Sequence, residues 1–495
     1  MSELGAVGRL NSDLTEEFLL EHGLIPLAIG PEAATIGAWG RRADRHALDQ
    51  LSLLLRRPLR ITPISEDEGT AAVRRAYGQA ATTADALIDS LSAEVARPDD
   101  EAAIDDLVSQ AHEAPVIRLV NMLLAEAVEA RASDVHIEQS RAGVAVRYRV
   151  DGVLLDAPSP PAGMAAAIVS RLKIMAELDI AERRLPQDGR IRLAVSGRQL
   201  DVRVSMLPSL HGESVVLRLL GSASARLSID ELGMPAELQA RFLSAASRSH
   251  GIVLVTGPTG SGKTTTLYAA LDHIRSGTEK VLTVEDPVEY ELPGAVQVSI
   301  KPGIGLTFAS ALRALLRQDP DVMLVGEIRD LETAQIAIHA ALTGHLVLST
   351  LHTNDAAGAL TRLVDLGVEP YLVASTVQAV LAQRLVRLTC AECGRWTAPS
   401  DSEASWAEAT GTRLDRVRRG AGCSECRGTG FRGRTGTYEL LSMSDDARAQ
   451  FGRGRSAMDI RDQAVRAGMR MLADAAVEFV KKGFTTPHEI ARVSG

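Results

Sequence analysis

Short apolar runs and helical patterns alternate along the second half of the chain. The runs are VLV, KVLTVE, DVMLVG and HLVLST, and the segments between them have the apolar spacing of helices. Strands separated by helices pair in parallel, because each crossover helix brings the chain back to the same edge of the sheet. We therefore predict that residues 223–495 form an α/β domain around a parallel sheet.

A different pattern precedes this domain, over residues 109–222. An amphipathic helix is predicted at 114–131 and a second helix at 165–178. Around them lie the alternating runs DVHIE, VAVRYRVDGVLL, RIRLAV, RQLDVRVSM and SVVLRLL. Alternation with a period of two indicates strands that bury one face. This part is predicted to be an α+β domain with an antiparallel sheet.

The N-terminal part carries a weaker pattern. Helical spacing at 43–58, followed by the strand-like PLRITPIS, predicts a small α/β module over residues 1–81. Residues 82–108 are acidic and poor in large apolar side chains, so we expect a solvated linker with some helix.

Composition narrows the range of functions. The chain has 495 residues, of which 45% are hydrophobic and 24% charged, as in ordinary soluble proteins. A net charge of −9 gives no general attraction to nucleic acid, and 3% aromatic residues argue against a base-stacking surface. Because neither a signal peptide nor a run of about 18 apolar residues is evident, we expect a cytoplasmic protein.

The stretch GPTGSGKT follows the apolar strand GIVLV and leads into a helix, which completes the strand–loop–helix pattern GxxxxGK[ST]. Its glycines let successive backbone N–H groups face phosphates, and the helix adds its positive N-terminal end. Lys263 is expected to reach the β and γ phosphates, and the Thr264 hydroxyl to bind Mg²⁺. The predicted nucleotide-binding residues are Gly257, Pro258, Thr259, Gly260, Ser261, Gly262, Lys263, Thr264 and Thr265.

Acidic residues follow two of the predicted strands. Glu285 ends the run KVLTVE and Asp286 comes directly after it, while Glu327 follows VMLV after one glycine. Ligands of open α/β sheets bind at the carboxyl ends of the strands, so Glu327 suits a general base or a water-positioning group. In TGHLVLSTLHTNDA (343–356), His345 is predicted to precede a strand, and a cluster of polar residues is predicted to follow it: Ser349, Thr350, His352 and Asn354.

All four cysteines lie in two pairs, CAEC (390–393) and CSEC (423–426), separated by 29 residues. This pattern predicts tetrahedral zinc ligation by Cys390, Cys393, Cys423 and Cys426 within a small subdomain at 385–440. A redox dithiol and inert thiols are the alternatives.

Four segments together resemble the secretion-ATPase superfamily: GPTGSGKTTTLYAAL, TVEDPVEY, LRQDPDVMLVGEIRD and TGHLVLSTLHTNDA. They are similar, in this order, to a Walker A loop, an aspartate box, a Walker B segment with Gly-Glu and a histidine box. From about residue 109 to the C-terminus, the chain most resembles the GspE-type ATPase of bacterial type II secretion. The resemblance implies a RecA-like ATPase domain after a PAS-like N2 domain, assembled as a hexameric ring at the inner membrane.

The resemblance also implies roles for single residues. Lys263 and Thr264 match the Walker A pair, and Glu285 matches the aspartate-box carboxylate. Glu327 matches the Walker B glutamate taken as the catalytic base, and His352 lies in the histidine box.

Three arginines are implied as further site residues. Arg203 and Arg218 match N2 arginines that approach the γ-phosphate, and Arg434 is a third candidate. An arginine delivered by domain closure would couple hydrolysis to motion, because its charge reaches the transition state in one geometry only.

The implied cofactors are ATP, Mg²⁺ and Zn²⁺, and the implied assembly is a homohexamer. The N-terminal module is expected to dock an inner-membrane partner of the GspL type, and the ring to contact a platform protein of the GspF type. Acidic phospholipid is a further possible partner, and no nucleic acid is expected. The protein would then be cytoplasmic and peripheral on the inner membrane. The N-terminal module could instead be a stabilising appendage.

The expected function is ATP hydrolysis that drives pseudopilus assembly and the secretion of folded proteins across the outer membrane. Assembly of type IV pili is the alternative of the same class. A nucleic-acid translocase and a nucleotide switch without motor action are alternatives of other classes.

Overall fold

The computed structural model describes residues 16–29, 33–39, 47–49, 51–52, 57–66, 68–70, 73, 114–141, 143–195, 198–220, 227–275 and 277–494. The predicted linker at 82–108 lies outside these ranges. The contacts divide the chain into two units, one of Met1–Val150 and Leu154–Leu219, the other of Asp151–Val153 and Leu220–Gly495. Each unit is described by itself below.

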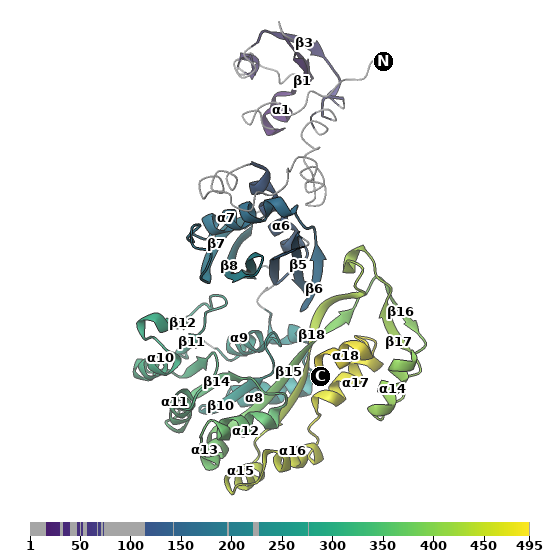
Figure 1. The fold of residues 1–495 in the computed structure, drawn as a ribbon. Coiled ribbons are helices and arrows are strands. Elements are labelled where there is room, and N and C mark those ends of the chain that lie inside the picture. Colours follow the sequence, from purple (N-terminus) through teal and green to yellow (C-terminus); the bar gives the residue numbers. More distant parts are fainter. Residues whose placement is uncertain are drawn as a thin grey trace. The chain divides into compact units, whose positions relative to one another are not determined.

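The larger unit is built on a seven-stranded sheet with the order β12-β11-β13-β14-β10-β15-β18 (Figure 1). All neighbouring strands are parallel except β15 and β18, which are antiparallel. The strands are β10 (Gly251–Thr256), β11 (Val281–Glu285), β12 (Ala295–Ser299), β13 (Val322–Val325), β14 (Leu346–Leu351), β15 (Val377–Thr389) and β18 (Phe431–Ser442). The predicted parallel α/β sheet is confirmed, whereas β12, β15 and β18 were not predicted.

Helices cover both faces of this sheet, which is why β10 is buried along its whole length. On one face, Ile252 and Leu254 pack in a core with four helices: α10 (Phe308–Leu315), α11 (Leu331–Leu342), α12 (Ala356–Asp365) and α13 (Pro370–Thr376). On the other face, Val253 and Val255 pack in a core with α8 (Ala236–Ala246) and α9 (Lys263–Ile274).

A cysteine-containing subdomain is inserted between β15 and β18. It contains β16 (Gly394–Thr397), α14 (Asp401–Ala409) and β17 (Val417–Gly420), with β16 and β17 antiparallel. The chain ends with α15 (Asp445–Gly452), α16 (Ala457–Arg466), α17 (Leu472–Lys481) and α18 (Pro487–Ser494). Both ends of the predicted 385–440 range therefore belong to strands of the main sheet.

The second half of the smaller unit is a six-stranded sheet with the order β6-β5-β4-β9-β8-β7. Its elements are α6 (Ala114–Glu129), β4 (Asp134–Ser140), β5 (Gly143–Val150), β6 (Val153–Ala157), α7 (Ala165–Met175), β7 (Gln187–Val195), β8 (Arg198–Ser209) and β9 (Gly212–Leu220). α6 and α7 pack in one core with the buried side chains of the sheet, for example Leu123, Leu172 and Val202. The alternation of buried and exposed residues along β9 fits the predicted one-sided strands. The likeness to a PAS domain stays a prediction.

The run VAVRYRVDGVLL forms two strands rather than one continuous run. Asp151 and Gly152 both have positive φ, 48° and 83°, and they separate β5 from β6. Asp-Gly is a preferred pair for a two-residue hairpin turn with this backbone geometry, so the turn signal overrides the apolar alternation.

The N-terminal part contains α1 (Glu16–His22) and a three-stranded sheet of β1 (Leu24–Ile29), β2 (Ala34–Ala38) and β3 (Leu59–Pro63). Leu19, Ile36 and Trp39 contribute to its core. A small α/β module is thus present here, and β3 coincides with the predicted strand PLRITPIS. Most of the predicted helix at 43–58 lies outside the described residues.

Candidate functional site

The phosphate-loop pattern occupies the turn between β10 and α9. β10 ends at Thr256 and α9 begins at Lys263, so the loop lies at the carboxyl end of a central strand. Gly257, Gly260 and Gly262 all have positive φ, as a curled loop requires. Pro258 and Thr259 are exposed, and Thr264 and Thr265 lie half-buried in the first helical turn.

The backbone of the loop holds the Lys263 side chain in place. Its Nζ donates to the carbonyl oxygens of Gly257 at 2.8 Å and Pro258 at 3.1 Å. Burial lowers the pKa of the ammonium from 10.5 to about 8, although Glu327 opposes the shift and Arg384 adds to it. The side chain is therefore a cation at neutral pH in a site of reduced solvent exposure.

Glu327 and His352 approach Lys263 from two other strands. Glu327 follows β13 and lies 3.4 Å from His352 Nε2, while His352 Nδ1 lies 3.5 Å from Lys263 Nζ. Burial, followed by the charge of Lys263, lowers the pKa of His352. A neutral ring with its proton on Nε2 would donate to Glu327 and accept from Lys263. Arg329 also forms an ion pair with Glu327, at 2.5 Å.

The other polar residues near His352 do not form the predicted cluster after the strand. Ser349 and Thr350 lie within β14, and their hydroxyl groups donate to the carbonyl oxygens of Val325 and Gly326 at 2.7 and 2.6 Å. The prediction that these two residues follow the strand is wrong, because β14 continues to Leu351. Their contacts instead fix the segment that carries Glu327.

Glu285 has a different environment from Glu327. Its carboxylate is buried at the end of β11 and accepts hydrogen bonds from the hydroxyl groups of Tyr268 and Thr283. Gln297 Nε2 donates to the same carboxylate at 3.3 Å. Burial and the bond to Glu285 raise the pKa of Tyr268 far above its usual range. The described partners of Glu285 thus join β11, β12 and α9, and Lys263 is not among them.

Sequence reasoning missed Arg329, Gln383 and Arg384. Arg329 stands two positions after Glu327 in GEIRD, and this adjacency to a predicted base was the available signal. Arg384 donates to the backbone and side-chain oxygens of Asn354 at 3.0 and 3.1 Å. Gln383 and Arg384 lie on β15, whose pairing with β10 no local pattern revealed.

The two arginines of the smaller unit lie on one sheet. Arg203 is on β8 opposite Arg190 of β7, and both line a hollow together with Arg218 of β9. Arg218 Nε also donates to Asp134 at 2.9 Å. Arg190 was not predicted, although it occupies a polar position of the alternating run RIRLAV. In the larger unit, Arg434 lies on β18 opposite Arg387.

The four cysteines meet in one cluster. Their sulfur atoms all lie within 4.8 Å of one another, with distances of 3.9 Å for Cys390–Cys423, 3.8 Å for Cys393–Cys426 and 3.7 Å for Cys423–Cys426. Four sulfurs at about 2.3 Å from one tetrahedral ion are about 3.8 Å apart, so the cluster is compatible with zinc.

The surroundings of Cys426 favour its thiolate. Burial raises the pKa of this thiol, but the backbone N–H groups of Cys423 and Gly430 donate to its sulfur at 3.2 and 3.3 Å and bring the pKa down to about 6. A thiolate is the form of cysteine that binds metal.

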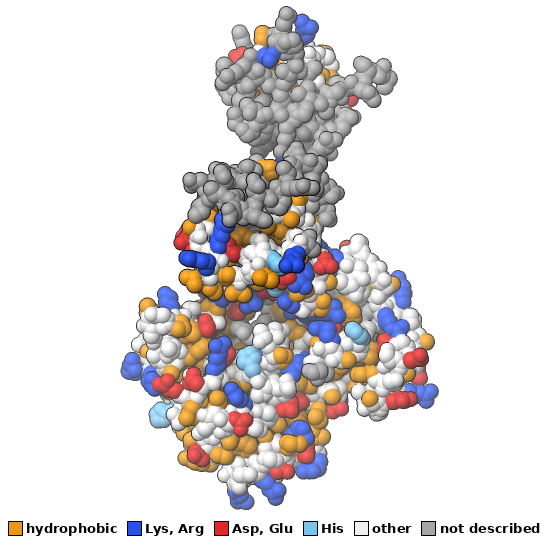
Figure 2. Space-filling model, viewed as in Figure 1, with side chains coloured by type: hydrophobic (Ala, Val, Ile, Leu, Met, Phe, Trp, Pro, Cys, Tyr) orange, Lys and Arg blue, Asp and Glu red, His pale blue; other side chains and the backbone are white. Residues whose placement is uncertain are grey.

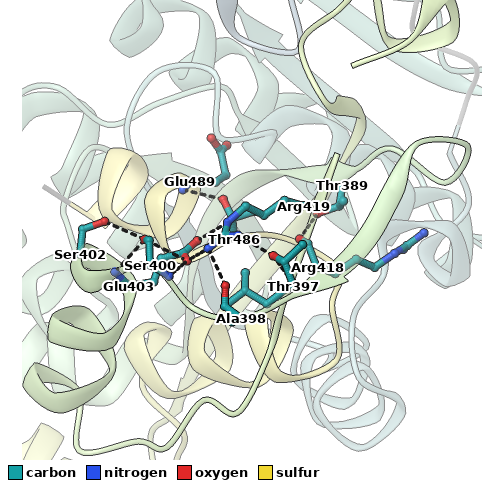
Figure 3. A network of polar contacts seen from close by, with 11 residues as sticks. Thr389, Thr397, Ala398, Ser400, Ser402, Glu403, Arg418, Arg419, Thr486 and Glu489 are labelled. Carbon is teal, nitrogen blue, oxygen red and sulfur yellow. Dashed lines mark hydrogen bonds and ion pairs between the residues drawn. The ribbon is translucent and has the colours of Figure 1, made fainter. Parts of the chain in front are cut away.

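A polar network supports the subdomain next to the cysteines (Figure 3). Arg419 of β17 forms an ion pair with Glu403 of α14 and donates to the carbonyl oxygen of Ala398 at 3.2 Å. Glu403 also accepts from the N-cap Ser400, which closes the start of α14. The Thr389 hydroxyl donates to the carbonyl oxygen of Arg418 at 3.4 Å, so the network reaches the end of β15.

A phosphate loop at the carboxyl edge of a parallel sheet, with an acidic side chain following a neighbouring strand, defines an ATPase domain of the P-loop class. The family model described as "Type II/IV secretion system protein" matches residues 109–492, and the chain belongs to this family. The predicted family is therefore confirmed.

Similar proteins include the "Type II secretion system protein HxcR" of Pseudomonas aeruginosa, which is 49% identical over 88% of this chain and 90% of its own length. The "Type II secretion system protein E" of Xanthomonas campestris pv. campestris is 45% identical over 97% and 84% of the two chains. The "Type II secretion system ATPase E" of Vibrio cholerae is 43% identical over 90% of each.

Two solved structures share the fold. The ATPase DotB of Legionella pneumophila covers 75% of this chain and 94% of its own, with a TM-score of 0.56 and 21% identity. The pilus retraction motor PilT with bound ADP covers 76% and 96%, with a TM-score of 0.51 and 25% identity. Among the described residues, no helix is both long and apolar enough to cross a membrane.

Proposed function

We propose that the chain is the ATPase that powers a type II secretion system. It is an ATP-hydrolysing enzyme of the secretion family, and the observation that carries the proposal is the convergence of Lys263, His352 and Glu327 at one end of the sheet. The named relatives supply the process, since they belong to type II secretion and match over most of both chains.

The residues divide the work as follows. Backbone N–H groups of the loop from Gly257 to Thr265 hold the phosphates, and Lys263 neutralises their charge. The Thr264 hydroxyl would help to hold Mg²⁺, which would supply charge neutralisation for the phosphates. Glu327 orients and deprotonates the attacking water, and His352 links this carboxylate to Lys263.

Glu285 acts more indirectly than its place in the sequence suggests. Its buried bonds to Tyr268 and Thr283 fix the end of β11 against α9. We therefore give it a positioning role rather than direct contact with the phosphates.

Three arginines would complete the site in the working assembly, a homohexamer. Arg203 and Arg218 stand on neighbouring strands and line the same hollow. Their delivery to the γ-phosphate would couple turnover to domain movement, with Arg434 as an additional contact.

The cysteine cluster serves structure. Four sulfur ligands would leave no open position on a tetrahedral Zn²⁺, so the cysteines would hold a structural ion that links the two CxxC segments. The proposed domain plan assigns residues 1–81 to partner docking, 82–108 to a linker, 109–222 to N2 and 223–495 to the ATPase domain.

In this proposal, partner proteins supply the membrane-embedded part of the secretion system. The N-terminal module docks a GspL-type protein of the inner membrane, acidic phospholipid adds to the attachment, and the ring drives a GspF-type platform during pseudopilus assembly. The chain is then cytoplasmic and peripheral on the inner membrane. Pilus extension is the alternative of the same class.

The net charge of −9 and the one face of the larger unit that Figure 2 shows give no support to a nucleic-acid translocase. On the face of the larger unit shown in Figure 2, Lys and Arg side chains are interspersed with Asp and Glu rather than gathered in one broad stripe. Proteins that track a nucleic-acid backbone present such a basic stripe.

The decisive experiment combines hydrolysis with secretion. Mg²⁺-dependent ATPase activity is measured with the partner's cytoplasmic domain and acidic vesicles, and separately with DNA, while a deletion strain is complemented with wild type, Arg203→Ala and Arg218→Ala. We expect stimulation by partner and lipid, rescue of secretion by wild type, and loss of about 10³-fold in turnover for each variant. Stimulation by DNA alone would contradict the proposal.

A further inference from the structure

Gln383 lies beside the start of the phosphate loop. β15 runs parallel to β10 with Ala382 opposite Thr256, so Gln383 is next in register to Gly257. The residue is buried, with 2% of its surface exposed. A buried amide requires hydrogen-bond partners for both of its polar ends, so its contacts are specific.

The amide of Gln383 joins the loop to the helix that follows it. Its Nε2 donates to the carbonyl oxygen of Ser261 at 2.7 Å, and its Oε1 accepts from the hydroxyl group of Thr266 at 2.7 Å. Ser261 and Thr266 stand on either side of Lys263 in the sequence. One side chain of β15 therefore fixes the backbone before the lysine and the first turn of α9 after it.

Two loop glycines allow this close approach. A Cβ at Gly257 would lie 2.4 Å from the carbonyl oxygen of Gln383, and a Cβ at Gly262 would lie 2.9 Å from its Nε2. Both distances are shorter than carbon makes with such atoms. The glycines thus permit contact with β15 in addition to the curled backbone.

We infer that Gln383 is a positioning residue that holds the phosphate loop in its binding conformation. Fixing Ser261 and Thr266 orders the N–H groups between them before nucleotide arrives, and this removes part of the entropic cost of binding. The inference rests on the proposed nucleotide site. Gln383 touches no substrate itself and acts through Ser261 and Thr266.

Gln378 on the same strand provides a matched control. It is also a buried glutamine with bonds at both ends of its amide: Oε1 accepts from Arg248 and Arg448, and Nε2 donates to the carbonyl oxygen of His250 at 3.4 Å. These partners lie at the other end of β15 from the phosphate loop. Gln378→Met therefore reports the general cost of losing a buried glutamine in this strand.

The first experiment measures binding of fluorescent mant-ADP with Mg²⁺ to the full chain, together with thermal unfolding. Gln383→Met keeps the length of the side chain and removes both hydrogen bonds, so we expect the Kd to rise about tenfold. Gln378→Met is expected to lower the melting temperature by a similar amount without changing the Kd. Thr266→Val should lose little further affinity when combined with Gln383→Met, because the shared bond is already absent.

A second variant, Gln383→Glu, adds a readout that depends on protonation. The neutral carboxyl group can donate to the Ser261 carbonyl and accept from the Thr266 hydroxyl, as the amide does. The ionised form places an acceptor against the Ser261 carbonyl and a negative charge below the phosphates. Because Lys263 and His352 titrate in wild type too, we divide the Kd of Gln383→Glu by the Kd of wild type at each pH. This ratio is expected to be near unity at low pH, where the carboxyl group is neutral, and to rise with pH.

These outcomes separate the inference from the proposed function. A wild type that binds nucleotide, with Gln383→Met and Gln378→Met binding equally well, overturns the inference and leaves the nucleotide site intact. A Kd ratio for Gln383→Glu that does not vary with pH also counts against it. A wild type that binds no nucleotide overturns the proposed function, and the inference with it.

Discussion

The phosphate-binding edge and the cysteine cluster are both connected to β15, but they are assembled in different ways. The cluster takes all four thiols from two short CxxC segments. One segment directly follows β15, and the other shortly precedes β18. The phosphate edge brings together residues that follow or lie on four different strands, β10, β13, β14 and β15. The first site depends on local spacing, and the second depends on the order of strands in the sheet.

This difference explains how reliably each site can be read from a sequence. Many folds can bring two CxxC segments together, and four converging thiols then restrict the kind of ligand that the site can bind. Two carboxylates at strand ends are equivalent in sequence, yet Glu327 meets His352 whereas Glu285 is buried against Tyr268. Which of them faces the phosphates is a property of the assembled sheet.

The largest expected effect separates the two carboxylates. Glu327→Gln should lower kcat by about 10² to 10⁴, because it removes the base but keeps the shape of the side chain. Nucleotide affinity, measured with mant-ADP, should be nearly unchanged. Asp321→Asn, at the opposite end of β13, is the control: Asp321 accepts from the backbone N–H of Lys280, and its loss should leave kcat intact. Full activity of Glu327→Gln would remove Glu327 from the base role.

The next test asks whether the cysteine cluster is as self-contained as its sequence suggests. Cys390→Ser should reduce the zinc content from about one ion per chain to none and lower stability by on the order of 3 kcal/mol. Nucleotide affinity should be retained. Metal analysis and thermal unfolding check both points, and Ser424→Ala, at an exposed position of the second knuckle, should change neither. An absence of zinc in the parent protein would refute the assignment.

The pH dependence of binding probes the phosphate edge alone. Phosphates favour the charged form of Lys263, so the complex takes up a proton when the free side chain is neutral. Because the pKa of free Lys263 is about 8, affinity should fall by up to about tenfold per pH unit above that pH and stay level just below it, before His352 titrates. Lys263→Met should bind more weakly and without this slope. A level wild-type profile up to pH 10 would contradict the lowered pKa.

The smallest effect is expected in the support of the cysteine subdomain. Arg419→Met removes the ion pair with Glu403 and should cost about 1 kcal/mol, since the arginine is partly solvent-exposed. Arg413→Met removes an exposed pair with Asp415 and should cost almost nothing. Unfolding in denaturant distinguishes the two variants, and equal stabilities would mean that the network of Figure 3 contributes little.

Much of the fold could be predicted because its signals are local. The strands β10, β11, β13 and β14 are short apolar runs between helices, and the phosphate loop carries its whole pattern within eight residues. By contrast, β15 begins directly after α13 without a turn signal, and its apolar residues resemble a buried helix segment as much as a strand. Because β15 was not predicted, Gln383 and Arg384 could not be assigned to the site from the sequence.

The class of ligand at each site could be predicted without the structure, because glycine spacing, the lysine and the paired thiols are patterns of residues that are close together in the chain. The packed sheet was needed to show which carboxylate lies near Lys263, that Ser349 and Thr350 support the backbone next to Glu327, and that Gln383, far away in the sequence, contacts the loop. Those choices follow from strand order and from the face on which each side chain emerges, and both are fixed only when the sheet is packed between its two layers of helices.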